Sequence, residues 1–207
     1  MERRFLVGLT GGMGSGKTEA LRQFSALGAV TISLDEIARA QALPNGRAFS
    51  KIVRAFGLGI LDEAGHIDRR KLARQVFSSS AARKRLENLT HPLILKEMRR
   101  LMSQSSGIVV ADVPLLFEGG HEKYFDATMA ILAPISLRLF RVSKRDSFSL
   151  SEIKKRMSSQ ISDKERKKRA DIAINNEGNL IGFRRKVAEY YQAFCLMAKA
   201  KIGSSGE

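Results

Sequence analysis

Cysteine, acidic residues and long apolar stretches are scarce in this 207-residue chain, and each shortage excludes a class of protein. The single cysteine, Cys195, cannot form a disulfide within the chain, which is typical of a reducing compartment. One cysteine and three scattered histidines do not make the pattern of a zinc site. No apolar run approaches the roughly 18 residues of a membrane span, and the basic start at residues 2–4 leads into a short strand-like run rather than a signal peptide. The sequence therefore predicts a cytoplasmic protein with no membrane segment.

The shortage of acidic residues leaves a net charge of +15, from 36 Lys and Arg against 21 Asp and Glu. Residues 138–169, here called the basic segment, contain 12 Lys and Arg and 4 Asp and Glu, and so supply +8 of this charge. Anionic partners are expected for such a protein. The segment could be a solvated helical face, a nucleic-acid patch or a lid that closes over phosphates, and composition alone leaves these three open.

Short apolar runs alternate with helical patterns along most of the chain. Strands are predicted at 5–9, 29–32, 107–111, 127–132 and 172–174. Helices are predicted at about 18–27, 35–43, 47–56, 68–77, 80–90 and 92–104, from about 135, and at 179–200. Strands that alternate with helices predict an α/β fold with a parallel sheet covered on both faces. The strand-poor stretch 36–104 is predicted to be a helical insertion beside that sheet.

Residues 11–18, Gly-Gly-Met-Gly-Ser-Gly-Lys-Thr, match the phosphate-loop pattern G-x-x-x-x-G-K-[ST]. Glycines allow main-chain N–H groups to converge on an anion, and the following helix points its positive end at the same place. Lys17 is expected to reach the β- and γ-phosphates of a nucleoside triphosphate, and the Thr18 hydroxyl is expected to bind Mg²⁺. The alternative is a glycine-rich turn with a solvated lysine. The position between a predicted strand and a predicted helix favours triphosphate binding.

Two carboxylates follow predicted strands at the sheet edge where open α/β folds bind ligands. Asp35, after the second strand, is a candidate base for an acceptor hydroxyl, or alternatively the N-cap of the next helix. Asp112, at the end of the third strand, is a candidate outer-shell partner of Mg²⁺, or alternatively a loop cap.

Several motifs in this order resemble the dephospho-CoA kinase family, from Leu9 to about Gly178. They are the loop of residues 9–18, Asp35-Glu36-Ile37-Ala38-Arg39, His91-Pro92-Leu93-Ile94, Val113-Pro114-Leu115-Leu116-Phe117-Glu118, Arg145-Asp146, Arg156-Met157 with Gln160, and Ala170-Asp171 through Asn176. The resemblance implies transfer of the γ-phosphate of ATP to the 3′-hydroxyl of dephospho-CoA, which gives CoA and ADP in the last step of CoA synthesis.

The resemblance also implies a P-loop NTPase fold in which helices flank a parallel sheet, with a helical substrate-binding insertion and a basic helical lid. The nucleotide-binding core would be residues 1–35, 105–137 and 170–203, the CoA-binding domain 36–104 and the lid 138–169. By similarity, Asp35 is the acceptor-hydroxyl base, and Arg39 and His91 belong to the acceptor pocket. Catalysis would rest on Lys17, Asp35 and Arg145, with Thr18 on the metal. The ATP-binding set would be Gly12, Met13, Gly14, Ser15, Gly16, Lys17, Thr18, Glu19, Arg141, Asn176 and Gly178.

One position departs from the family pattern. The family usually has Asp-Ala-Asp after the second strand, whereas this chain has Ser33-Leu34-Asp35. Serine can form hydrogen bonds but supplies no charge, so activity is expected to persist with altered metal dependence.

The remaining expectations concern side chains and competing functions. His91 is expected in the acceptor pocket or, alternatively, as a cap or turn residue, and most of Arg166–Arg169 is expected on an exposed face. Another phosphate-loop kinase, acting on a nucleoside or nucleotide, and a nucleic-acid-binding NTPase are the alternative functions. The sequence has no recognisable nucleic-acid reading motif, which argues against the latter and against a specific nucleic-acid partner. A monomer is expected.

Overall fold

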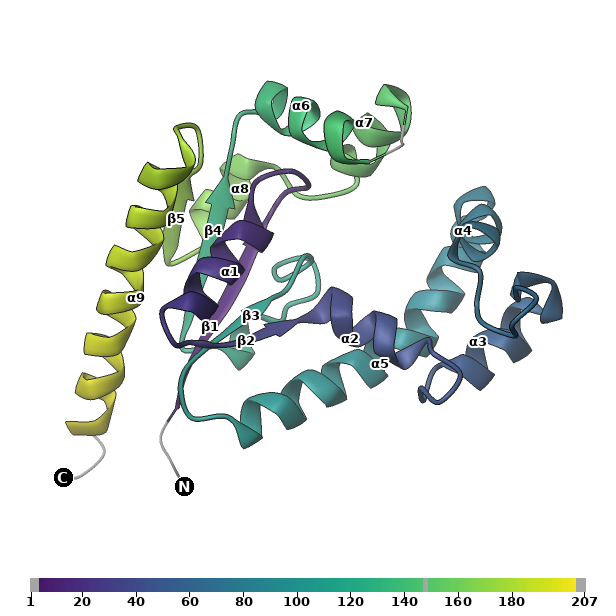
Figure 1. Ribbon diagram of the computed structural model, residues 1–207, viewed down its shortest axis with the longest axis horizontal. Helices are drawn as coiled ribbons and strands as arrows, with labels where there is room; N and C mark the ends of the chain where they lie inside the picture. Colours follow the sequence, from purple (N-terminus) through teal and green to yellow (C-terminus); the bar gives the residue numbers. More distant parts are fainter. Residues whose placement is uncertain (1–3, 147–148, 204–207) are drawn as a thin grey trace. The chain divides into compact units, whose positions relative to one another are not determined.

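The computed structural model describes residues 4–146 and 149–203. Residues 2 and 3 of the basic start and residues 147 and 148 of the basic segment lie outside this description. The elements in chain order are β1 (Arg4–Gly11), α1 (Lys17–Ala26), β2 (Val30–Ser33), α2 (Leu34–Gln41), α3 (Phe49–Phe56), η1 (Leu58–Ile60), α4 (Arg69–Ser78), α5 (Ser80–Gln104), β3 (Gly107–Asp112), η2 (Glu122–Tyr124), β4 (Ala127–Leu132), α6 (Ile135–Arg145), α7 (Leu150–Ser158), α8 (Asp163–Arg169), β5 (Ile172–Asn175) and α9 (Leu180–Gly203). Figure 1 labels the α-helices and the strands.

The five strands form one sheet in the order β2-β3-β1-β4-β5. The pairs β1–β3, β1–β4 and β4–β5 are parallel, with Leu9 opposite both Asp112 and Met129. The prediction of a parallel sheet with helical connections is therefore confirmed. Because β1 is central, its carboxyl end delivers the phosphate loop to the middle of the sheet edge.

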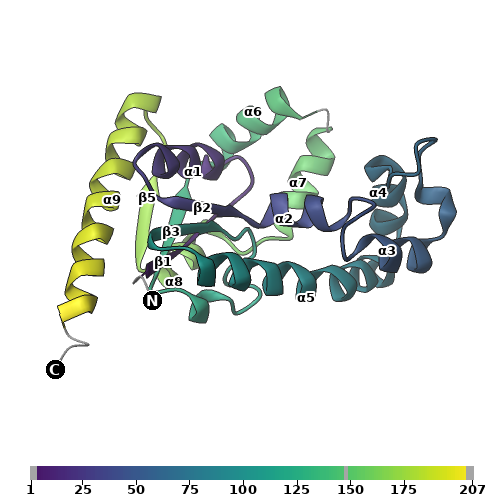
Figure 2. The ribbon, with the colours of Figure 1, turned by 60° about the horizontal axis from the view of Figure 1, so that its bottom comes forward.

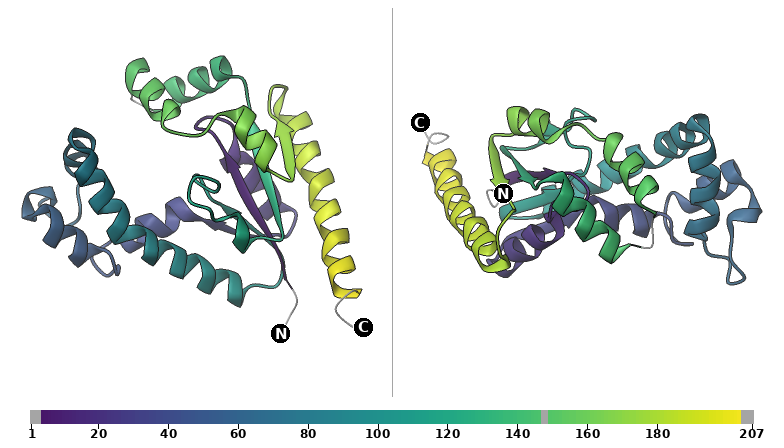
Figure 3. Two further views of the ribbon diagram at one scale, coloured as in Figure 1. Left: turned by 180° about the vertical axis from the view of Figure 1, so that it is seen from behind. Right: turned by 90° about the horizontal axis from the view of Figure 1, so that it is seen from above.

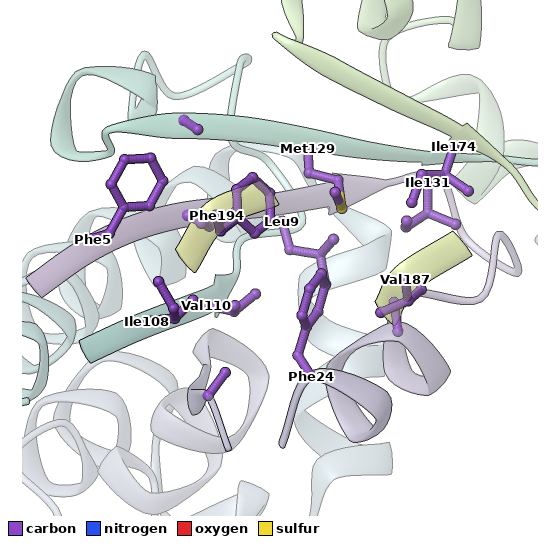
Figure 4. Close-up of a cluster of buried hydrophobic side chains, with 14 of the residues drawn as sticks. Phe5, Leu9, Phe24, Ile108, Val110, Met129, Ile131, Ile174, Val187 and Phe194 are labelled. Carbon is purple, nitrogen blue, oxygen red and sulfur yellow. The ribbon is translucent and has the colours of Figure 1, made fainter. Parts of the chain in front are cut away.

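A core of apolar side chains lies between the sheet and the helices α1 and α9 (Figure 4). Phe5, Val7 and Leu9 of β1 alternate toward this core, as expected for a strand whose successive side chains point to opposite faces. They pack with Phe24 of α1 and Phe194 of α9, whose ring centroids are 6.1 Å apart. Seen from behind, in the left panel of Figure 3, α8 covers the opposite face of the sheet at β4. The sheet is thus covered on both faces, as the apolar strands require.

The chain divides into two compact units, residues 1–32 with 105–207 and residues 33–104. The first is called the core unit and the second the helical unit. Within the helical unit, α3, η1, α4 and the amino-terminal half of α5 share an apolar cluster around Ile52 and Ile60, joined by Leu86 and Leu93 of α5. Figure 2 shows α5 as one continuous helix along which the other helices of this unit are arranged.

The prediction of separate helices at 80–90 and 92–104 is wrong, because α5 runs unbroken through Pro92. Proline removes one helical hydrogen bond and crowds the preceding turn. Packing on both sides of Pro92 offsets this cost: Leu86 and Leu93 join the helical-unit cluster, and Met98 and Met102 are buried further along. His91 consequently lies inside a helix, exposed, and the cap or turn alternative for it is also wrong.

No helix in the described part of the chain combines the length and the apolar character that a membrane crossing requires.

Candidate active site

The phosphate loop connects the carboxyl end of β1 to the amino terminus of α1. It is closed by a turn in which the Ser15 N–H donates to the Gly12 carbonyl at 3.0 Å. Gly14 and Gly16 have φ angles of 78° and 105°, in the left-handed region that favours glycine. Gly16 is the N-cap of α1 and has no side chain to cap it, so N–H groups of the first turn remain for an anion. The loop therefore has the local geometry of an anion site.

Lys17 and Thr18 begin α1 at this site. The Lys17 ammonium donates to the Gly11 carbonyl at 2.9 Å, so its side chain folds back over the loop. Thr18 is exposed in the first turn of the helix. Glu19, the next residue, forms ion pairs with Arg184 of α9 at 2.7 Å and with Arg22 at 3.9 Å. Lys17 and Thr18 thus lie beside the loop at the amino terminus of α1, and Glu19 connects α1 to α9.

Arg141 and Asn176 lie against the phosphate loop from two other elements. The Asn176 side-chain amide donates to the Ser15 carbonyl at 2.8 Å. The Arg141 guanidinium donates to the Asn176 carbonyl at 3.2 Å and, with longer bonds, to the carbonyls of Gly14 and Ser15. The structure thus brings together these members of the predicted ATP-binding set, which are 126 and 161 residues away from Ser15 in the sequence. Gly178 follows in the exposed turn after β5.

Met13 is held by two residues of the basic segment. Its main-chain N–H donates to Gln160 Oε1 at 3.1 Å, and its carbonyl accepts from Arg138 Nε at 2.8 Å. Arg138 passes so close to Gly12 that a β-carbon there would collide with the guanidinium. A glycine at position 12 is therefore needed for the approach of Arg138.

Arg138 belongs to a network of charges whose two arginines are buried. Its Nη1 lies 3.3 Å from both carboxylate oxygens of Asp163, which also accepts from Arg166 Nη1 at 2.8 Å. Arg166 Nη2 is 3.7 Å from Glu118. Burial lowers the pKa of Arg138 from its usual value, and the Asp163 carboxylate opposes that shift. Two cations and two carboxylates balance one another, which is the condition for burying such groups.

Most of Arg166–Arg169 is exposed, as expected, and the exception is Arg166, which is 0% exposed. Helical periodicity places this residue on the face of α8 that packs on the sheet, where Asp163 and Glu118 neutralise its charge. Lys167 and Lys168 are exposed, as expected.

Arg145, the predicted catalytic arginine, is bound to its neighbour in the sequence. It donates to Asp146 through Nε at 2.9 Å and Nη2 at 2.8 Å, and 60% of its side chain is exposed. Hydrogen bonding from Arg145 lowers the pKa of Asp146, and the same pair raises the pKa of Arg145. The arginine is thus exposed at the end of α6, with a carboxylate that neutralises it.

Asp112 ends β3 beside the start of the phosphate loop. It lies opposite Leu9 in the sheet and is buried, and the next residue, Val113, donates to the Leu9 carbonyl at 2.8 Å. The Asp112 carboxylate and the Thr18 hydroxyl are oxygen donors, the type of ligand that Mg²⁺ prefers. Their chemistry fits a magnesium ion accompanying a nucleotide.

In the helical unit, Ser33 takes the capping position that was one of the two alternatives for Asp35. Ser33 is the N-cap of α2, and its hydroxyl accepts from the Glu36 N–H at 3.3 Å. The alternative of Asp35 as the cap is therefore wrong, and Asp35 is exposed in the first turn of the helix. Serine at this position caps the helix without supplying a charge.

Arg39 lines a pocket of about 270 Å³ within the helical unit, together with apolar side chains of α2, α4 and α5 and with His66. His91 is one residue beyond Thr90, which lines this pocket, but is not in the lining itself. A second pocket, of about 970 Å³, lies in the core unit between α6, α7, α8 and the ends of β4 and β5. No residue of the phosphate loop lines that pocket, but Arg138 and Gln160, which bind Met13 of the loop, do.

Comparison with known proteins gives a match to the family model described as dephospho-CoA kinase, over residues 5–181. The chain belongs to the dephospho-CoA kinase family. The dephospho-CoA kinase of Methylococcus capsulatus is 38% identical over 94% of this chain and 99% of the relative. That of Moorella thermoacetica is 38% identical over 91% of each chain. The resemblance found in the sequence motifs is confirmed.

Solved structures agree with the family assignment. The dephospho-CoA kinase from Campylobacter jejuni is 32% identical, with a TM-score of 0.68 over 96% of this chain and 99% of that chain. A protein from Thermus thermophilus is 29% identical, with a TM-score of 0.80 over 93% and 98%. A shikimate kinase from Acinetobacter baumannii, 15% identical with a TM-score of 0.53, shares the fold alone. The predicted P-loop kinase fold is confirmed.

Arg138 is a residue of the site that sequence reasoning did not identify. A signal was present, because residues 138, 141 and 145 are spaced by three and four and so share one face of α6. The contacts of Arg138 with Asp163 and Met13 depend on how α6 and α8 pack, so no local pattern in the sequence predicts them.

Proposed function

We propose that this protein transfers the γ-phosphate of ATP to the 3′-hydroxyl of dephospho-CoA, giving CoA and ADP. The observation that carries the proposal is a phosphate loop, in which Lys17 donates to the Gly11 carbonyl, in a chain that matches the dephospho-CoA kinase family over residues 5–181. The dephospho-CoA kinase of Methylococcus capsulatus aligns over 94% of the chain, which supports carrying its named activity to this protein.

The nucleotide would be bound by the core unit. Main-chain N–H groups of residues 12–18 would surround the β- and γ-phosphates, and Lys17 would move from the Gly11 carbonyl to a phosphate oxygen. Arg141 and Asn176, which already contact the loop, support binding of the nucleotide beside it, with Gly178 near the adenine. Thr18 and Asp112 would hold Mg²⁺, directly and through water, and the ion would neutralise charge on the phosphates.

The acceptor would be bound by the helical unit, residues 36–104 of which form the proposed CoA-binding domain. Asp35 would accept the proton of the 3′-hydroxyl as its oxygen attacks the γ-phosphorus, with ADP as the leaving group. Its freedom from the capping role supports this assignment. Arg39 would bind an anionic group of the acceptor, and His91 would lie at the edge of the same pocket.

The basic segment would act as the lid. Arg145 would leave Asp146 and bind the transferring phosphoryl group, whose spread negative charge matches a planar guanidinium. Closure would also exclude water, which limits wasteful hydrolysis of ATP. The protein would act in the cytoplasm, as a monomer, without a specific nucleic-acid partner.

A coupled assay of ADP release, with and without dephospho-CoA, tests the function. ADP release that depends on dephospho-CoA, with a product heavier by one phosphate in the mass spectrum, is the expected result. A panel of nucleosides and nucleotides serves as the control for the acceptor. Faster phosphorylation of a panel member than of dephospho-CoA would contradict the proposed acceptor.

A further inference from the structure

Both main-chain hydrogen-bonding groups of Met13 are occupied by side chains from outside the phosphate loop. Gln160, after α7, accepts from the N–H at 3.1 Å, and Arg138, on α6, donates to the carbonyl at 2.8 Å. Loops usually satisfy such groups with water or with near neighbours in the chain. Here the partners are 147 and 125 residues away, so they fix the middle of the loop to the basic segment.

Arg138 is itself fixed. Only 6% of the residue is exposed, and its Nη1 faces both oxygens of Asp163 at 3.3 Å. Asp163 also binds Arg166, which is completely buried on the sheet. Arg138 therefore connects α8 to Met13 through two direct contacts, an ion pair with Asp163 and a hydrogen bond to the Met13 carbonyl. Gly12 leaves the space for this contact, because a β-carbon there would collide with the guanidinium.

We propose that Arg138 and Gln160 are positioning residues for phosphoryl transfer, which hold the phosphate loop in its phosphate-binding shape by binding Met13 from both sides. The property that the two residues control is the binding of a nucleoside diphosphate. The inference rests on the proposed function only where it concerns the phosphoryl-transfer reaction. A loop held in one conformation loses less conformational entropy when phosphates bind. Neither residue needs to contact the nucleotide for this effect.

The matched test replaces each residue by an apolar side chain of similar size. Arg138→Met and Gln160→Leu are compared with Lys144→Met, which removes an exposed cation from the same helix, where its ammonium lies 4.5 Å from the Phe140 ring centroid. Each positioning variant is expected to bind ADP about tenfold more weakly, the effect of losing one hydrogen bond that orders a binding loop. The KM for ATP is expected to rise with it while the KM for dephospho-CoA is unchanged. Lys144→Met is expected to bind ADP as the unmodified protein does.

Two further measurements separate positioning from mere support of the fold. Arg138→Lys keeps a positive charge for Asp163 but lacks the planar fork that reaches Asp163 and Met13 together. It is expected to recover thermal stability without recovering ADP affinity. The double variant Arg138→Met/Gln160→Leu is expected to lose less affinity than the sum of the single losses, because both residues act through Met13.

Gln160→Leu keeps the test decisive if Arg138→Met does not fold, because Gln160 is only half-buried and takes no part in the charge network. ADP affinity of Gln160→Leu equal to that of the unmodified protein would overturn the proposal. So would an Arg138→Lys variant that recovers affinity and stability together. Calorimetry with ADP needs no acceptor, so a failure to phosphorylate dephospho-CoA would contradict the proposed function and leave the positioning result standing.

Discussion

Gly16 and Asn176 lie so close together that a β-carbon on residue 16 would collide with the side-chain amide of Asn176. That amide donates to the Ser15 carbonyl at 2.8 Å, and Gly16 has a φ of 105°. Two independent conditions, a left-handed backbone and a lack of space, therefore require glycine at the residue that caps α1. The loop after β5 thus helps to set the shape of the phosphate loop.

Gly16→Ala is expected to reduce ADP affinity by more than tenfold, because the methyl group displaces Asn176 and strains the backbone by about 1–2 kcal/mol. Calorimetry with ADP measures the loss. Gly107→Ala is the matched control, since Gly107 has a φ of 70° but, among the described residues other than its chain neighbours, none has an atom within 4 Å of the place where a β-carbon would lie. It is expected to show backbone strain alone. Equal ADP affinities for the two variants would contradict a role for the Asn176 contact.

Lys17→Ala is expected to reduce turnover by about two orders of magnitude or more, because positioning and electrostatics supply most of the catalysis of phosphoryl transfer. The rate of CoA formation at saturating substrates measures this. Arg22→Ala, which removes a cation from an exposed position on the same helix, is the control and is expected to turn over normally. A Lys17→Ala variant that turns over as fast as the control would show that Lys17 has no catalytic role.

Asp35→Asn is expected to preserve ATP affinity and to lower turnover about 10²-fold or more, the range typical of a lost general base. Glu36→Gln, a neutralised carboxylate in the same first turn of α2, is the control. Both variants keep the Ser33 cap, so helix stability does not confuse the comparison. Near-normal turnover by Asp35→Asn would leave this carboxylate without a catalytic role.

Substitutions of Ser33 separate its effect on the stability of α2 from its effect on the Mg²⁺ requirement. Ser33→Ala is expected to reduce the free energy of unfolding by about 1 kcal/mol, because the Glu36 N–H loses its partner. Ser33→Asp restores the carboxylate usual in the family and still caps α2. It is expected to keep that stability and to reach half-maximal activity at a lower Mg²⁺ concentration. Urea denaturation and Mg²⁺ titration measure the two effects; an unchanged Mg²⁺ requirement would show that the serine has no effect on the metal.

The Arg145–Asp146 pair predicts a pKa that responds to ligands. Arg145 holds the pKa of Asp146 below its usual 3.8, so the pair stabilises the folded protein above about pH 3.8 and this contribution is lost as the pH falls through the lowered value. If Arg145 moves to the phosphates, the pKa of Asp146 should rise toward 3.8 when an unreactive ATP analogue and dephospho-CoA are bound. NMR titration of the carboxyl carbon measures it, and Arg145→Gln gives the raised value without ligands. A pKa that does not change on ligand binding would show that Arg145 stays on Asp146.

Local patterns in the sequence were sufficient for most of the fold. Each predicted strand is present, because an apolar run of three to six residues between polar turns has few alternatives to a buried strand. Pro92 is the exception, since its effect on α5 depended on the packing of Leu86, Leu93 and Met98 rather than on the proline itself. A local rule was overridden by burial.

In the candidate site, too, local sequence patterns determined one part and tertiary packing the other. Glycine spacing and the Lys17-Thr18 pair determined the phosphate loop, because those residues act within one strand–turn–helix unit. The tertiary structure decided which distant side chains support it: Arg138 and Gln160 on Met13, Asn176 against Gly16, and Ser33 rather than Asp35 as the cap of α2. The contacts of the phosphate loop join residues more than a hundred positions apart. The cap of α2 depends on which of two nearby side chains, Ser33 or Asp35, lies at the start of the helix. The free energies of these contacts depend on burial and geometry that exist only once the helices have packed.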